Sequence, residues 1–93
     1  MAKINLKEAY QRLKEASETF NDSWCLEKTA KGERKKQLQL EMDAAIIRVH
    51  IAIDDCPEVL NYIDDFSFNP NHFKSDLELL VSNLSKLNLN EVS

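Results

Sequence analysis

Apolar side chains recur at spacings of three and four residues through the first quarter of the chain. They are Leu6, Ala9, Tyr10, Leu13, Ala16, Phe20 and Trp24. At about 100° per residue these positions share one face of an α-helix, so we predict an amphipathic helix over about residues 5–30. Asn5 has a side chain that caps helices, and Glu8 follows it at the capping-box spacing. Because residues 21–23 are poor helix formers, we expect a kink or a brief interruption there.

A polar segment follows, in which no apolar residue is larger than Ala30. It contains Gly32, the only glycine of the chain, and glycine commonly ends a helix in a left-handed conformation. We therefore predict that residues 27–37 form the exposed tip of a helical hairpin.

The second predicted helix, residues 33–55, has two apolar faces. The first comprises Leu38, Met42, Ala45, Ile46, Val49, Ala52 and Ile53, and the second comprises Leu40, Ala44, Ile47 and Ile51. A helix with water on one side needs only one apolar face, so we expect protein to cover this helix from both sides. Either it is the central helix of the bundle, or its second face meets another copy of the chain.

A β-strand is the alternative for part of this segment, because residues 38–42 and 47–53 alternate between apolar and polar. Two helical faces also produce local alternation, and the flanking sequence RKKQLQLEMDAA favours a helix. We therefore predict a helix throughout.

Proline positions define the rest of the chain. Pro57 disfavours helical geometry before it and is well placed at a first helical position, so we predict a short helix over residues 57–65. Asn69 and Pro70 start a last helix over residues 70–88 in the same way, with the tail 89–93 frayed. Its predicted buried face is Phe73, Leu77, Leu80, Val81, Leu84 and Leu87. The fold class is therefore all-α, a small bundle in which a long antiparallel hairpin packs against a short third helix and a fourth.

Composition agrees with this assignment. The 93 residues are 43% hydrophobic and 30% charged, which is typical of one globular domain spanning residues 1–93. The apolar stretch 44–53 contains Arg48 and His50 and is too short to cross a bilayer, and the first residues lack the apolar segment of a secretory signal. Two cysteines are too few for a disulfide framework, so we expect a cytoplasmic location.

Charge is unevenly distributed along the chain. Residues 1–36 hold nine Lys/Arg and six Asp/Glu, a net charge of +3, and the remaining residues hold three and ten, a net charge of −7. The predicted hairpin tip carries a basic group formed by Lys28, Lys31, Arg34, Lys35 and Lys36. It is the candidate site for an anion or a nucleic acid, but the overall charge of −4 weighs against nucleic acid as the main partner.

Two further sets of residues are candidates for chemistry. His50 and Asp54 lie four apart on one helical face, but a metal site needs at least three ligands and no HExxH or paired CxxC motif is present. Cys25 and Cys56 would lie about 25 Å apart along the predicted hairpin, whereas a disulfide requires Cα atoms within about 7 Å. Cys56 also lies among acidic residues, which raise a thiol pKa. We therefore expect no metal, no cofactor and no catalytic residue.

The function expected from the sequence is protein binding. A chain of this length leaves little room for a substrate pocket beside its core. We expect a non-enzymatic protein with a regulatory, adaptor or inhibitory role toward a protein partner, of the kind seen in immunity or phage accessory proteins, as a homodimer. The candidate partner-binding residues are the second face (Leu40, Ala44, Ile47 and Ile51), the acidic residues Asp54, Asp55, Glu58, Asp64 and Asp65, and the aromatic residues Phe66 and Phe68. The alternatives are a nucleic-acid-associated regulator that uses the basic tip, and a metal- or ligand-binding protein centred on His50 and Asp54.

Overall fold

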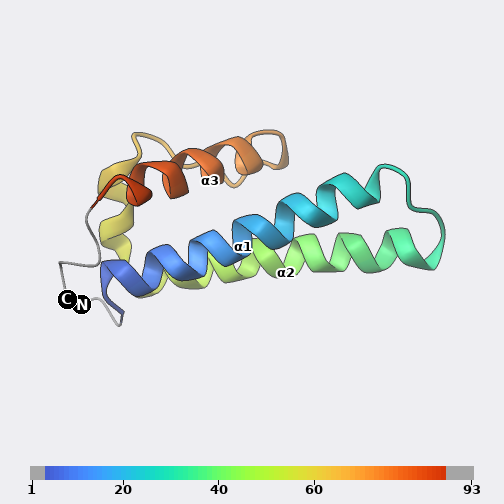
Figure 1. Ribbon diagram of the computed structural model, residues 1–93, viewed down its shortest axis with the longest axis horizontal. Helices are drawn as coiled ribbons and strands as arrows, with labels where there is room; N and C mark the ends of the chain where they lie inside the picture. Colours follow the sequence, from blue (N-terminus) through green and yellow to red (C-terminus); the bar gives the residue numbers. More distant parts are fainter. Residues whose placement is uncertain (1–3, 88–93) are drawn as a thin grey trace.

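The computed structural model describes residues 4–87, which form a long helical hairpin with a shorter helix packed against it (Figure 1). The elements are α1 (Leu6–Glu27), α2 (Glu33–Asp55), the 3₁₀ helix η1 (Pro57–Tyr62) and α3 (Pro70–Ser85). The molecule is elongated, with extents of 45 × 22 × 21 Å. The described residues contain no β-strand, so the all-α prediction is confirmed and the strand alternative for residues 38–53 is wrong.

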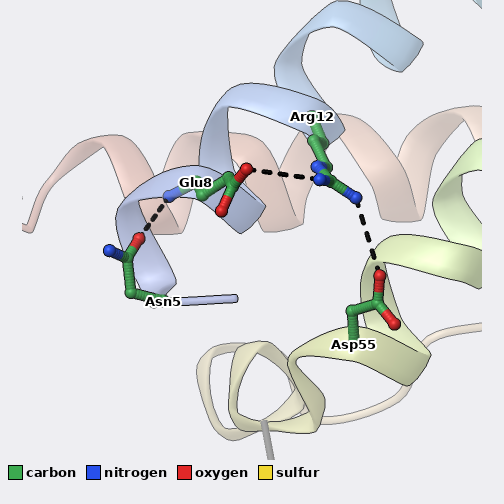
Figure 2. Close-up of polar contacts among 4 residues, drawn as sticks. All are labelled: Asn5, Glu8, Arg12 and Asp55. Carbon is green, nitrogen blue, oxygen red and sulfur yellow. Dashed lines mark hydrogen bonds and ion pairs between the residues drawn. The ribbon is translucent and has the colours of Figure 1, made fainter. Parts of the chain in front are cut away.

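Helix α1 begins as its sequence predicts. The Asn5 Oδ1 accepts a hydrogen bond of 2.8 Å from the backbone N–H of Glu8 (Figure 2). The Glu8 carboxylate does not complete the capping box; it accepts a 3.2 Å bond from Arg12. Arg12 also lies 3.6 Å from the Asp55 carboxylate, so it joins the first turns of α1 to the last turn of α2.

The expected interruption at residues 21–23 is wrong, because α1 continues through them to Glu27. Ser23 is buried, and its hydroxyl donates a 3.1 Å hydrogen bond to Glu41 on α2. A tertiary contact therefore satisfies the polar group that would otherwise compete with the backbone. Helix α1 ends at Glu27, three residues before the predicted end at residue 30. After it, the backbone N–H groups of Thr29 and Ala30 both donate to the carbonyl oxygen of Leu26.

The hairpin turns at Gly32, whose φ of 64° lies in the left-handed region that favours glycine. Helix α2 then has the predicted bounds. It ends before Pro57, and Cys56 occupies the junction with η1. The Asp55 side chain does not cap η1 and instead faces Arg12. The predicted helix over residues 57–65 is a 3₁₀ helix that ends at Tyr62.

Helix α3 ends at Ser85, three residues before the predicted end. The predicted end at residue 88 and the frayed tail 89–93 lie outside the described residues. The loop before α3 is held by Asp76, whose carboxylate accepts a 2.9 Å bond from the backbone N–H of Ser67. Helix α3 packs against α1 and η1 along the half of the hairpin distant from its tip (Figure 1).

The core lies between α1, α2 and α3, and the predicted inner faces supply most of it. Its fully or nearly fully buried members are Ala9, Leu13, Ala16, Phe20, Ala45, Val49, Ala52, Ile53, Phe73, Leu77, Leu80 and Leu84. Cys56, Val59 and Ile63 also belong to it and close the end of the hairpin, a contribution that the sequence did not indicate. Helix α1 packs against both α2 and α3, so α1 is the central helix and α2 is an edge helix. Of the two alternatives for the second apolar face of α2, the central position in the bundle is therefore wrong.

Candidate functional site

The most distinctive surface is the side of α2 that points away from the core. Leu40, Ala44, Ile47 and Ile51 lie there, and we call these four residues the outer face. Leu40 is 67% exposed, Ile47 57% and Ile51 48%. The inner residues of α2 occupy the opposite side of the helix, as the two-faced pattern predicts. Within residues 4–87, protein covers α2 from one side only, so this part of the chain leaves the outer face as an unpartnered apolar surface.

Charged side chains border the outer face on two flanks. Glu41 and Arg48 lie on the flank toward α1, where Arg48 and Ile51 line a shallow groove with Arg12 and Glu15 of α1. Lys36, Asp43, His50 and Asp54 lie on the flank toward the loop before α3; all four are exposed. An apolar stripe with a polar rim has the organisation of a protein interface.

The basic tip is exposed, as predicted, but two of its charges have local contacts. Lys35 Nζ lies 3.6 Å from the Glu27 carboxylate, and Lys28 Nζ lies 5.9 Å from the centre of the Trp24 ring. Lys31, Arg34 and Lys36 are exposed. The basic residues therefore lie together in space but are interrupted by acidic and aromatic contacts.

The acidic candidates are spread over three segments. Asp54 lies in the last turn of α2, Glu58 lies in η1, and Asp64 and Asp65 follow η1; these four are exposed. Asp55 is partly buried beside Arg12 and is therefore part of the fold's own contacts. A second shallow groove runs past Asp64 and Asp65 and is bordered by Leu79 and Asn83 of α3.

Aromatic rings form a continuous cluster under the loop before α3. Phe73 is fully buried and lies 5.1 Å from Phe20 between ring centres, with Phe66 and Phe68 at 5.9 and 6.0 Å. Phe68 is 37% exposed, and its ring stacks on His50 with centres 3.7 Å apart and planes 11° apart. Phe68, a candidate partner-binding residue, therefore packs partly on α2 and remains partly exposed.

The structure offers no set of ligands for the hypothetical metal site at His50 and Asp54 among the residues it describes. Among the described residues, no group of three or more His, Cys, Asp or Glu side chains is arranged to hold a metal ion. The His50–Phe68 contact had no signal in the sequence, because it depends on how the loop folds back on α2.

The two cysteines are free and lie in different environments, Cys25 exposed and Cys56 buried. Burial raises the pKa of the Cys56 thiol above its ordinary value of 9.0, and the negative charge of Glu58 raises it further. A thiol with a raised pKa is a poor nucleophile at neutral pH, because the thiolate is the reactive form.

Comparisons with known proteins add no functional information. No family model, curated protein or solved structure matches the chain. Within residues 4–87 no helix has both the length and the apolar character needed to cross a membrane. The outer face and its charged flanks form the candidate site.

Proposed function

We propose that this protein acts by binding another protein through the outer face of α2, in a regulatory, adaptor or inhibitory role. The observation that carries the proposal is the exposure of Leu40, Ile47 and Ile51 along one side of a well-packed helix. Scattered exposed apolar residues need no explanation, but a contiguous apolar stripe with a polar rim is typical of an interaction surface.

A binding role is better supported than a catalytic one. The cysteine with a shifted pKa is buried in the core, and its pKa moves away from the range of a reactive thiolate. His50 is exposed, and its ring stacks on Phe68. Cys56 and His50 are thus both engaged in packing.

Affinity capture from native lysate tests the proposal. Tagged wild-type protein is compared with the double variant Ile47→Asp/Ile51→Asp, which places two charges on the outer face without touching the core. We expect the wild type to capture a protein, either an untagged second copy of itself or another chain, and the double variant to lose it. Circular dichroism should show that both proteins are equally helical.

The matched control is Leu79→Asp, which adds a charge at an exposed leucine of α3 (52% exposed). It should retain the captured protein. If the outer-face variant and the wild type capture the same proteins in the same amounts, the outer face is not the binding surface and the proposal is wrong.

A further inference from the structure

The apolar residues of the outer face are symmetric about one point of α2, between Ala45 and Ile46. Leu40 precedes that point by as much as Ile51 follows it, and Ala44 and Ile47 are related in the same way. Two copies of α2 packed antiparallel about a two-fold axis at that point would place Leu40 against Ile51 and Ala44 against Ile47. A two-fold interface requires such a self-complementary patch.

Charges on the flank toward the loop before α3 fit the same antiparallel arrangement. Lys36 and Asp54 are separated by about five helical turns, so they lie on the same flank of the outer face. A two-fold axis perpendicular to two antiparallel helices brings equivalent flanks together. Lys36 of one copy then lies beside Asp54 of the other, offset by about 1.5 Å along the helix. Within the described chain neither residue has an ion-pair partner of its own.

Charges on the flank toward α1 also fit the antiparallel arrangement. Glu41 and Arg48 are about two turns apart and share the flank toward α1. In the antiparallel pair, Glu41 of one copy lies within about 3 Å along the helix of Arg48 of the other. The symmetry doubles each contact, so four oppositely charged pairs would border the apolar centre.

If the two α2 helices were parallel, the flank toward α1 of one copy would meet the flank toward the α3 loop of the other. Residues with similar numbers would then lie at the same level along the two helices. Asp54 would then approach Asp55 of the second copy, and Asp43 would approach Glu41. Like charges in contact disfavour an interface, so the charge pattern selects the antiparallel arrangement. The ends of the molecule agree, because the basic tip and η1 with its acidic neighbours lie at opposite ends of the hairpin (Figure 1).

We propose that the occupant of the outer face is a second copy of this chain, with the two α2 helices antiparallel. This inference rests on the proposed function, since it names the partner of the same surface. It also accounts for the second apolar face of α2, which residues 4–87 of a single chain leave exposed.

Disulfide trapping in the 93-residue chain tests the orientation of the two α2 helices. In a Cys25→Ser background, Leu40→Cys and Ile51→Cys are made separately, one of them with a size tag, and are oxidised alone and as a mixture. The antiparallel pair predicts a mixed disulfide between the two variants. Leu40→Cys alone should cross-link poorly, because its two copies would lie about 17 Å apart along the axis. Strong cross-linking of each variant with itself and none in the mixture would overturn the antiparallel arrangement.

Charge exchange provides a second test that does not depend on cross-linking. Lys36→Glu and Asp54→Lys should each weaken self-association by about tenfold, since each replaces two attractive pairs by repulsive ones. The variant carrying both changes should return to within about twofold of the wild type, because the exchanged charges attract again. Lys86→Glu makes the same charge change away from α2 and should have little effect. Additive weakening in the double variant would overturn the pairing.

The two proposals fail in different ways. A wild type that stays monomeric while the outer face captures another protein would overturn the second-copy inference and leave the proposed function standing. If the double variant Ile47→Asp/Ile51→Asp self-associates as strongly as the wild type and also captures the same proteins, both proposals are wrong.

Discussion

Cys25 and Cys56 show how strongly local environment separates two identical side chains. Cys25 is exposed on α1, whereas Cys56 is fully buried where α2 meets η1. The neutral thiol of Cys56 packs against apolar neighbours, and the charged form is disfavoured there. The same residue therefore contributes to the core and loses reactivity.

The raised pKa of Cys56 predicts a dependence of stability on pH. In the range above the ordinary value of 9.0, the unfolded chain loses this proton before the folded chain does. The contribution of the buried Cys56 thiol to the free energy of unfolding is therefore complete below about pH 9, and it declines as the pH rises further. Urea unfolding of the wild type and of Cys56→Ala should show a difference in free energy that shrinks between pH 8 and pH 10. A difference that grows over this range would contradict the assigned environment.

Asn5 predicts a smaller effect at the start of α1. Replacing it by alanine removes the acceptor for the Glu8 N–H and should lower the free energy of unfolding by about 1 kcal/mol. Asn5→Asp keeps an acceptor and places a negative charge at the helix N-terminus, so it should be tolerated. Thermal or urea unfolding of both variants checks this, and equal losses for alanine and aspartate would show that the cap is not the cause.

At the scale of elements, adjacent leucines of α3 offer the sharpest contrast. Leu80 is fully buried between α3 and α1, whereas Leu79 is 52% exposed. Leu80→Ala should cost about 2–5 kcal/mol of stability through lost contacts and a cavity. Leu79→Ala should cost about 0.5 kcal/mol or less. Chemical denaturation of both variants measures the difference, and similar losses would mean that α3 is packed on a different face.

The helical periodicity predicted α2 to the residue and the buried faces of α1, α2 and α3, because each is a long and strongly periodic segment. It failed where tertiary contacts decide the local structure. The Ser23–Glu41 hydrogen bond stabilises α1 across a polar segment. Val59 of η1 is buried because η1 packs on the end of the hairpin. Such contacts join residues far apart in the sequence and leave no local pattern.

The candidate site was predicted to a similar extent. The wheel positions of Leu40, Ala44, Ile47 and Ile51 identified the outer face, and the structure places all four on the exposed side of α2. The sequence pattern left open what covers that side, because the answer depends on another molecule. The pairing of Asp55 with Arg12 and the stack of His50 on Phe68 were missed, since both depend on how separate elements meet.

At the scale of the whole molecule, charge and shape act together. The molecule is 45 Å long and about half as wide, and the basic tip of the hairpin lies at the opposite end from η1 and its acidic neighbours (Figure 1). An elongated molecule with opposite charges at its ends favours side-by-side association in opposite directions. The outer face lies along the side that such association would bury.

Sedimentation equilibrium of the 93-residue chain shows whether a second copy covers the outer face of α2. If it does, we expect a mass of about twice 10.7 kDa in the wild type and a single-chain mass in Ile47→Asp/Ile51→Asp. A wild type with a single-chain mass at every concentration up to about 1 mM, where even weak binding of about −4 kcal/mol would be visible, would contradict it.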